Sequence, residues 1–333
     1  MNILLTGGAG YIGSHTATVL SLTGHDVVLY DNLSNSSVVI LERVKHIAGQ
    51  RLRFVKGDVR DTNLLEKTLA SHRVDAVMHF AGLKAVGESV HKPIEYSANN
   101  VQGTISLLQA MQSQKIKKLV FSSSATVYGE PRYLPLDENH PTSATNPYGR
   151  SKLHIEEILS DVAKSDPDWS IVCLRYFNPV GAHPSGLIGE NPNGIPNNLM
   201  PYIAQVAAGQ RAELSVFGAD YPTIDGTGVR DYIHVMDLAE GHEAALKYLN
   251  QTTGWHAVNL GTGKGYSVLQ MVKAIERASG HAVPFRVVDR RAGDVAACFA
   301  DPQRAKKLFD WTAKRSLEEM CSSSWFFQHS VIS

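Results

Sequence analysis

Short apolar runs alternate with longer stretches of helical periodicity through the first half of the chain. An apolar run at residues 3–6 is followed by a helical pattern that continues to Leu22 and ends at Gly24. The same alternation is repeated several times, as expected for strands that are each followed by a helix. Further strand-like runs lie at residues 27–30, 52–55, 76–80 and 118–122, and helical segments lie at residues 64–71 and 99–114.

This alternation predicts an α/β fold, a Rossmann-like doubly wound parallel sheet with helices on both faces. Apolar runs at residues 171–176 and 256–260 can add two strands. Between them, residues 179–201 are rich in Gly, Pro and Asn, which is typical of a functional loop. We therefore expect a nucleotide-binding Rossmann domain over residues 1–177, to which the strand near 256–260 returns. A smaller C-terminal α/β substrate domain is expected over residues 178–333.

Composition narrows the classes of function. The chain has 333 residues, and Lys+Arg and Asp+Glu both number 32, so no basic excess favours a nucleic-acid partner. The longest apolar runs are strand-sized, which argues against a membrane span. The first residues lack the basic region and the cleavage site of a signal peptide. Cys173, Cys298 and Cys321 show no close spacing, which argues against a disulfide framework and predicts a cytoplasmic protein.

The first strand runs directly into a glycine loop. Gly7, Gly10 and Gly13 have the form G-x-x-G-x-x-G, in which glycine lets the backbone approach a pyrophosphate at a helix N-terminus. Asp31 follows the last glycine by 18 residues and ends the second strand, where a carboxylate can accept from a ribose 2′-hydroxyl. The same carboxylate would repel a 2′-phosphate, so the pattern predicts NAD rather than NADP. A capping or turn aspartate is the alternative role for Asp31.

Two later strands end in segments suited to the same cofactor. Asp58 follows the third strand, where it can hydrogen-bond an adenine amino group or serve as a turn residue. Residues 80–84 follow the fourth strand, and their small side chains let a cofactor lie close to the sheet edge. Lys84 can reach a ribose or a phosphate, although a solvent-exposed lysine is the ordinary alternative.

The fifth strand and the next helix carry groups that can transfer a proton. Ser124 ends a run of three serines, and Pro147 places Tyr148 in the first turn of a helix. Lys152 lies four residues after the tyrosine and therefore on the same helix face. A neighbouring ammonium lowers the pKa of a phenol, ordinarily about 10, and makes the phenolate a usable base. We expect Tyr148 to take a proton, Lys152 to supply the charge and Ser124 to share the hydrogen bond, while hydride goes to NAD.

Six segments make the chain resemble the UDP-glucose 4-epimerases of the extended short-chain dehydrogenase/reductase family. The resemblance extends from the first strand to about residue 301, and its most specific parts are the second and fifth segments. The glycine loop and the Tyr-x-x-x-Lys pattern are common to the wider superfamily. The six segments are residues 6–15, 79–89, 121–129, 147–152, 174–186 and 226–235.

The resemblance implies tightly held NAD and an isomerase reaction on a nucleotide sugar. Carbon 4 of the hexose is oxidised to a 4-keto intermediate, the sugar turns about its diphosphate link, and hydride returns to the opposite face. Such an enzyme interconverts UDP-glucose and UDP-galactose, and it serves galactose metabolism and the supply of nucleotide sugars for surface polysaccharides.

The resemblance also assigns roles to individual residues. Without it, ion pairs with Asp231 and Asp294 would be the expected roles of Arg230 and Arg291. The implied NAD contacts, with the loop glycines and the catalytic Ser124, Tyr148 and Lys152, are Tyr11, Ile12, Asp31, Asn32, Leu33, Ser34, Asn35, Ser36, Asp58, Val59, Phe80, Ala81, Gly82, Leu83, Lys84, Asn99 and Phe177. The implied UDP-sugar contacts are Asn178, Asn198, Arg230 and Arg291, with Leu214, Ser215, Val216 and Phe217 lining the uracil.

Cys298 bears on the choice of sugar. In the family that the chain resembles, a bulky tyrosine at this position narrows the sugar pocket, whereas a small residue makes room for a 2-acetamido group. The hypothesis is that the chain also interconverts UDP-GlcNAc and UDP-GalNAc. The alternative is a small buried cysteine without that consequence.

Two other functions compete on the same fold. A nucleotide-sugar 4,6-dehydratase shares the first oxidation but needs an acidic pair directly after the serine, where this chain has Ala125 and Thr126. A non-catalytic NAD-binding regulator would not need Tyr148, Lys152 and Ser124 together. No histidines, cysteines or carboxylates stand at metal-ligand spacing.

A homodimer is the expected assembly. The resemblance points to helices near residues 99–114 and 148–165, and two apolar helices per subunit suit a two-fold interface.

Overall fold

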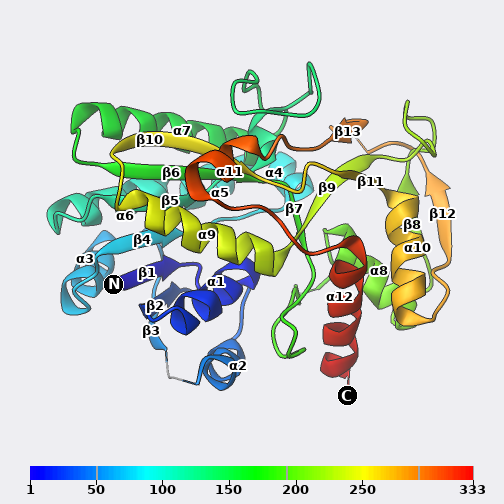
Figure 1. Cartoon of the computed structure of the whole chain (residues 1–333), viewed down its shortest axis with the longest axis horizontal. Coiled ribbons are helices and arrows are strands. Elements are labelled where there is room, and N and C mark those ends of the chain that lie inside the picture. The colour runs from blue at the N-terminus through cyan, green and yellow to red at the C-terminus, as the bar shows by residue number, and fades with distance from the viewer. Residues whose placement is uncertain (50–51, 193, 292, 333) are drawn as a thin grey trace.

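A seven-stranded parallel sheet forms the centre of the structure, a computed structural model that describes residues 1–49, 52–192, 194–291 and 293–332. Its order is β10-β6-β5-β4-β1-β2-β3, and every neighbouring pair is parallel (Figure 1). The predicted doubly wound α/β fold is therefore confirmed. The strands are β1 (Asn2–Thr6), β2 (Asp26–Asp31), β3 (Arg53–Lys56), β4 (Ala76–His79), β5 (Lys118–Ser122), β6 (Ser170–Tyr176) and β10 (Gly254–Leu260).

Helices cover both faces of this sheet because its strands are apolar on both sides. Ile3 and Leu5 of β1 point into one core, and Leu4 between them points into the other. In Figure 1, α9 lies along one face and α7 along the other. The first core is closed by α1 (Tyr11–Leu22), α2 (Val39–Ala48), α9 (Val235–Leu249) and α11 (Gln303–Phe309), and the second by α3 (Thr62–Ser71), α6 (Gln102–Ser113) and α7 (Pro147–Ser165).

A smaller group of elements lies at one end of the main sheet, around a third apolar core (Figure 1). In its larger sheet, β9 pairs with β7, β11 and β13, whereas β8 pairs only with β12. Helix α12 packs against α8 and α10. The elements are β7 (Asn178–Val180), α8 (Leu199–Ala207), β8 (Leu214–Phe217), β9 (Val229–His234), β11 (Gly265–Ser267), α10 (Val268–Ser279), β12 (Phe285–Val288), β13 (Ala297–Cys298) and α12 (Leu317–Ile332).

Four short elements complete the chain. A 3-10 turn, η2 (Ala125–Val127), follows β5. Helices α4 (Val86–His91) and α5 (Pro93–Tyr96) follow β4, and a π-helical turn, η1 (Ser97–Val101), leads into α6. π-Helical turns like η1 are frequent at functional sites.

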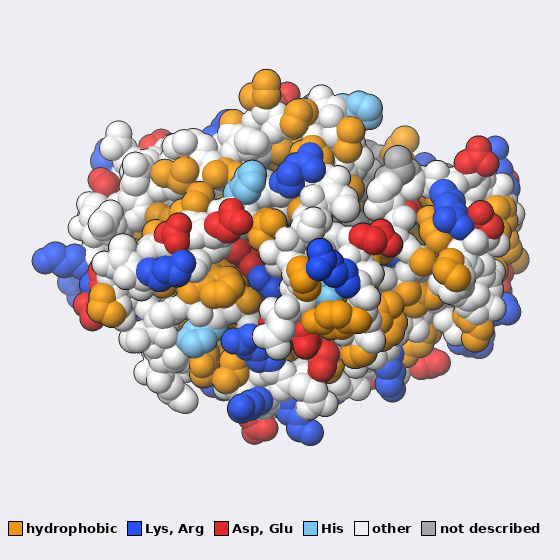
Figure 2. Space-filling model, turned by 90° about the horizontal axis from the view of Figure 1, so that it is seen from above, with side chains coloured by type: hydrophobic (Ala, Val, Ile, Leu, Met, Phe, Trp, Pro, Cys, Tyr) orange, Lys and Arg blue, Asp and Glu red, His pale blue; other side chains and the backbone are white. Residues whose placement is uncertain are grey.

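The surface agrees with the balanced charge of the sequence. On the face in Figure 2, basic and acidic side chains are interspersed among apolar ones, without a large area of one sign. No helix within the described ranges is long and apolar enough to cross a membrane.

Candidate active site

Helix α7 begins with a local arrangement that places its first turn firmly. Asn146 is the N-cap, and its side-chain oxygen accepts from the Gly149 amide at 2.8 Å. Pro147 occupies the first helical position, where its missing N–H costs no hydrogen bond. Tyr148 therefore lies in the first turn and Lys152 one turn later, on the same face.

Lys152 is buried at the carboxyl end of β5. Its side chain is 3 % exposed, and Nζ donates to the Ser122 carbonyl at 2.6 Å. Nζ lies 6.0 Å from the centre of the Tyr148 ring and 4.8 Å from that of Phe121. Burial lowers the pKa of Lys152 to about 8, while the Glu156 carboxylate opposes this shift. The ammonium therefore remains mostly charged at neutral pH.

The pKa of Tyr148 departs from the expectation that Lys152 would lower it. Burial raises the pKa of Tyr148, and a hydrogen bond with Ser124 lowers it only in part. Ser124 has extended backbone after β5, and its Oγ accepts from the Thr126 amide at 3.2 Å. The protein alone thus brings Tyr148, Lys152 and Ser124 together but leaves the phenol protonated near neutral pH.

The glycine loop lies directly against the end of β4. Gly7 has a left-handed φ of 67°, and a Cβ there would lie 2.6 Å from the Ala81 amide nitrogen. A Cβ on Gly13 would lie 2.5 Å from the Gly7 carbonyl oxygen. Gly10 is the N-cap of α1 and has no side chain to cap the helix, so its first-turn amides can receive a phosphate. These residues fit the diphosphate of a dinucleotide.

Asp31 is buried and joins two loops. Its Oδ2 accepts from the Ala9 amide at 3.0 Å, and its Oδ1 accepts from the Leu33 amide at 2.8 Å and from the Ser36 hydroxyl at 3.0 Å. The turn role considered as its alternative is therefore present. A carboxylate with two accepting oxygens can also receive a ribose hydroxyl, because each oxygen has more than one lone pair.

The segment after β4 lies beside the catalytic lysine. A Cβ on Gly82 would lie 3.8 Å from Lys152 Nζ and 3.3 Å from Asn100 Oδ1. Asn100, in η1, accepts from the Leu83 amide at 2.8 Å and donates to the Leu83 carbonyl at 3.0 Å and to Ser151 Oγ at 3.1 Å. This buried asparagine joins the expected cofactor segment to α7. It escaped sequence analysis, although a polar residue on the inner face of a helix was a usable signal.

Other expected cofactor residues lie around the same edge. Asp58 accepts from Asn32 Nδ2 at 3.3 Å, and its ion pair with Arg60, at 2.7 Å, holds the pKa of Asp58 well below its usual value. Val59 and Phe177 are buried. Asn99 donates to Asn100 at 3.0 Å.

Glu190 links the cofactor side to the expected sugar side. Its Oε1 lies 2.9 Å from Lys84 Nζ and 2.6 Å from Asn198 Nδ2. Lys84 is therefore a solvent-exposed lysine, as its alternative role had it, and it also has a carboxylate partner. Nothing in the sequence near Glu190 indicated this contact, because its partners come from distant segments.

The two arginines expected to bind the UDP-sugar have different partners in the structure. Arg230 of β9 is the strand neighbour of Cys298 of β13, and its Nη1 donates to the Val229 carbonyl at 2.8 Å. Asp231 accepts instead from Thr262 and from the amides of Gly263 and Ala300, so the expected Arg230–Asp231 ion pair does not form. Arg291 does pair with Asp294, at 2.9 Å, and its guanidinium lies 5.5 Å from the Phe217 ring centre.

Strand β8 limits what can line a base. Leu214 and Val216 are buried in the third core, whereas Phe217 is 42 % exposed and Ser215 is half-buried. The alternation of side chains leaves Ser215 and Phe217 on the outer face. The side chains of Leu214 and Val216 thus face the core, and the lining role expected of the strand stays a prediction. Asn178 is exposed directly after β6.

The C-terminal helix contacts the loop that faces α1. Ser324 Oγ accepts from the Gly181 amide at 3.1 Å, and Ser323 Oγ accepts from the Ala182 amide at 3.2 Å. The Gly181 carbonyl in turn accepts from the Tyr11 hydroxyl at 2.7 Å. These serines lie beyond residue 301, where the resemblance seen in the sequence ends. Among the described residues, no cluster of His, Cys, Asp or Glu is suited to a metal ion.

Comparison with known proteins decides the family. The family model described as GDP-mannose 4,6 dehydratase matches residues 4–324. The UDP-glucose 4-epimerase of Bacillus subtilis is 59% identical over 332 residues, which cover 100% of this chain and 98% of that protein. The chain belongs to the UDP-glucose 4-epimerase family.

Solved structures of this epimerase family share the whole fold. The UDP-glucose-4-epimerase of Stenotrophomonas maltophila, with bound NAD and formylated UDP-arabinopyranose, has a TM-score of 0.98 and 51% identity, and the match covers 100% of this chain and 99% of that one. The Bifidobacterium longum UDP-glucose 4-epimerase, in complex with NAD+ and UDP, has a TM-score of 0.97 and 54% identity over 99% and 98% of the two chains. NAD is the cofactor of this epimerase family. The dehydratase model is thus a match at the level of the superfamily.

Replacement of Asn100 by alanine should loosen the segment beside Lys152. Loss of its bonds to Leu83 and Ser151 leaves buried polar groups unpaired, and we expect the free energy of unfolding to fall by about 1–3 kcal/mol. Urea denaturation measures this loss, and spectroscopy of NAD released on denaturation measures a lower cofactor content. Gln102→Ala, on an exposed position of α6, is the control. An Asn100→Ala protein that matches the control in both measurements would contradict the assignment.

Proposed function

We propose that this protein is an NAD-dependent epimerase that interconverts UDP-glucose and UDP-galactose through a 4-keto intermediate. The observation that supports it best is the placement of Tyr148, Lys152 and Ser124 beside the segment at residues 80–84. Gly82 lies so close to Lys152 Nζ that a Cβ would be 3.8 Å away. Proton transfer and cofactor binding therefore share one edge of the sheet, as in other open α/β sheets.

Residues of this chain would hold NAD in a cradle without side-chain obstruction. The glycine loop and the first turn of α1 receive the diphosphate, Asp31 accepts from the adenosine ribose, and residues 80–84 support the nicotinamide end. Asn99 and Phe177 complete the proposed contacts. Bound NAD would supply the hydride acceptor for carbon 4 of the sugar and, once reduced, the donor that returns the hydride to the same carbon.

Tyr148 moves the proton. In one direction its phenolate accepts the proton of the sugar 4-hydroxyl, and Ser124 hydrogen-bonds the same oxygen. Because the protein alone leaves the phenol protonated, we expect the Lys152 ammonium, 6.0 Å from the Tyr148 ring centre, and the cofactor charge together to favour the phenolate. In the return direction Tyr148 gives the proton back, so the same phenol acts once in each half of the cycle.

The UDP part anchors the substrate while the sugar turns. A diphosphate needs fixed cations, and the guanidinium groups of Arg230 and Arg291 can bind it in bidentate fashion. Phe217 and Ser215 offer side chains to the uracil, and Asn178 and Asn198 offer amides. Asn198 already donates to Glu190, so part of this set is held in place before substrate arrives.

We also propose a cytoplasmic location and a metabolic role for the protein. Cys173, Cys298 and Cys321 are all free thiols, which suits the reducing cytoplasm. The proposed activity would serve galactose metabolism and the supply of nucleotide sugars for surface polysaccharides.

Tyr148→Phe should abolish the reaction without loss of the fold. Removal of a general acid–base group typically lowers the rate by about 10²–10⁴-fold, so we expect a loss of kcat in this range with NAD still retained. The test incubates purified protein and UDP-galactose, without added cofactor, and resolves the sugars by chromatography. Tyr133→Phe, at a residue that is 45 % exposed, is the control. Full activity in the Tyr148→Phe protein would rule out Tyr148 as the group that moves the proton, whereas an unaltered protein without epimerase activity would favour a non-catalytic NAD-binding regulator.

We also propose turnover of the acetamido pair, UDP-GlcNAc and UDP-GalNAc. Cys298 is half-buried beside Arg230 and packs against the cluster that contains Ala125 and Phe177, close to Ser124. Burial raises the pKa of the Cys298 thiol to about 11, so the side chain is small and neutral at pH 7. These properties leave space and impose no charge where a 2-acetamido group would lie.

Cys298→Tyr should remove the turnover of UDP-GlcNAc and UDP-GalNAc and preserve the turnover of UDP-glucose and UDP-galactose. The added ring fills the proposed space, whereas Cys298→Ala keeps it open and should leave both activities near those of the unaltered protein. Initial rates with UDP-galactose and UDP-GalNAc measure the two activities separately. An unaltered protein that turns over UDP-galactose but not UDP-GlcNAc or UDP-GalNAc would rule out this specificity.

A homodimer is proposed as the assembly, with α6 and α7 near the two-fold axis. Helices α4 and α5 pack against α7 and carry an outward apolar stripe at helical spacing. In this stripe Val90 is 58 % exposed and Ile94 is 83 % exposed. A second copy of the chain would cover such side chains and gain hydrophobic stabilisation.

Analytical ultracentrifugation at micromolar concentration should give the mass of two chains. Ile94→Asp places a charge in the proposed interface and should shift the mass toward one chain. Ile224→Asp, at a residue that is equally 83 % exposed but lies in the loop before β9, should leave the mass unchanged. A one-chain mass for the unaltered protein would refute the dimer.

A further inference from the structure

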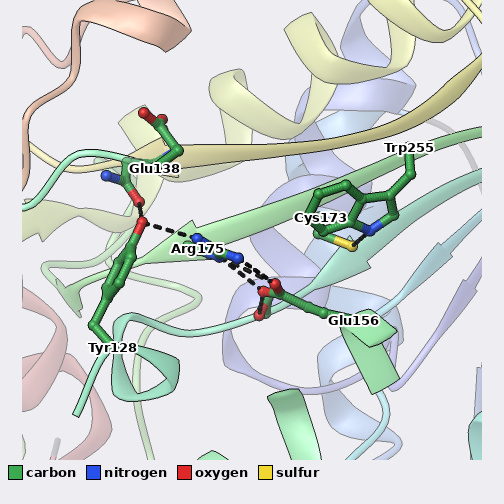
Figure 3. A network of polar contacts seen from close by, with 8 residues as sticks. Tyr128, Glu138, Glu156, Cys173, Arg175 and Trp255 are labelled. Carbon is green, nitrogen blue, oxygen red and sulfur yellow. Dashed lines mark hydrogen bonds and ion pairs between the residues drawn. The ribbon is translucent and has the colours of Figure 1, made fainter. Parts of the chain in front are cut away.

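A buried ion pair lies behind the catalytic turn of α7. Glu156 is one helical turn after Lys152 and is 2 % exposed, and Arg175 of β6 is 4 % exposed. The guanidinium binds the carboxylate with both ends of its fork, at 3.0 Å from Nε to Oε1 and 2.5 Å from Nη2 to Oε2. Figure 3 shows the two groups facing each other. The proposed proton transfer does not use either of them directly.

Glu156 also holds the segment that carries Ser124. Its Oε1 accepts from the Ser123 hydroxyl at 2.5 Å. Ser123 lies between Ser122, whose carbonyl accepts from Lys152, and Ser124, the proposed partner of the substrate hydroxyl. One carboxylate therefore fixes the main chain that receives the lysine.

The Arg175 side of the ion pair is also held by hydrogen bonds. Arg175 Nη1 donates to the Tyr128 hydroxyl at 3.2 Å, and that hydroxyl donates to Asn259 Oδ1 at 2.6 Å (Figure 3). The Asn259 amide donates to Glu138 Oε1 at 2.7 Å. This network leaves the guanidinium little freedom to move toward Lys152, so the two members of the pair keep fixed places.

Polar and ionisable groups from several elements surround Lys152. On α7 these are Tyr148 and Glu156, and on β5 they are the Ser122 carbonyl and the Phe121 ring. The other surrounding residues are His79 of β4, Gly82 of the following loop and Cys173 of β6, and Arg175 of β6 is the ion-pair partner of Glu156.

Most of these neighbours are neutral at pH 7. Burial lowers the pKa of His79 to about 3, and burial raises the pKa of the Cys173 thiol well above its usual value. Burial likewise lowers the pKa of Lys152 to about 8, and Glu156 is the main group that opposes this shift. The carboxylate is therefore the chief negative charge that supports the ammonium.

We propose that Glu156 is a positioning residue for the reaction, which keeps Lys152 charged and in place at the end of β5. Arg175 and Ser123 hold the carboxylate where it performs this role. The role rests on the proposed function, because it acts only through Tyr148 and Lys152.

Glu156→Gln tests the charge while keeping an acceptor for Ser123. Without the carboxylate, Lys152 should lose its proton at lower pH, because an opposite charge at close range stabilises the ammonium. The alkaline limb of the kcat profile should move down by about one pH unit, since a close counter-charge is typically worth that much or more. KM for UDP-galactose should change less than about twofold, because Glu156 is buried behind the helix.

Glu157→Gln is the matched control. It removes the same charge from the next position of α7, which is exposed, and the profile should not move. If Glu156→Gln lowers thermal stability but leaves the pH profile of kcat in place, Glu156 is structural only and the inference fails.

A double variant tests the same role if the Glu156→Gln protein does not fold. The single variant leaves a buried guanidinium unpaired, which can destabilise the fold strongly, whereas Glu156→Gln with Arg175→Gln removes both charges and leaves none unpaired. The double variant should still show the displaced alkaline limb, and an undisplaced limb would overturn the role. An unaltered protein that retains NAD but has no epimerase activity would instead overturn the proposed function.

Discussion

A positive charge must be kept at Lys152 in surroundings that oppose it. The side chain is almost fully buried, which lowers its pKa to about 8, yet its value to Tyr148 depends on the charge. A buried cation is tolerated only with close partners. Here these are the Ser122 carbonyl, which is bound directly, and Glu156 one turn farther along α7. Much of the architecture between β4 and β6 can be understood as support for this one ammonium.

The parallel sheet explains why that support converges with the cofactor cradle. Carboxyl ends of parallel strands meet at one edge, so the glycine loop, the segment after β4 and the serines after β5 are neighbours although about 115 residues separate the first from the last. Side chains then join these loops across the edge. Asn100 binds both Leu83 and Ser151, and Glu190 binds both Lys84 and Asn198. Each link ties a loop that would contact the cofactor to an element that would face the sugar in the proposed function, so the two proposed sites are braced against each other.

Features that depend on local sequence were predicted, whereas contacts between distant segments of the chain were missed. The strands, the glycine loop and the Tyr148–Lys152 pair rest on local periodicity and on the ends of strands, and they were predicted. Glu156 and Arg175 were missed because each looks like an ordinary charged residue, and their pairing depends on how α7 packs on β6. In β8 the alternation Leu-Ser-Val-Phe already implied an inner face with Leu214 and Val216 and an outer face with Ser215 and Phe217, and the burial of the strand agrees with it.

The two residues after Ser124 separate this chemistry from dehydration. Both reaction types begin with a ketone at carbon 4, but loss of water then requires an acid and a base on the protein. Ala125 is 9 % exposed and packs in an apolar cluster with Val127, Tyr128 and Phe177. A carboxyl group there would be desolvated and protonated, which suits an acid, whereas a methyl group cannot exchange a proton at all. Alanine and threonine at these positions supply no such acid and base, so the proposed ketone would be left to the return of hydride, which can reach either face of a sugar that turns.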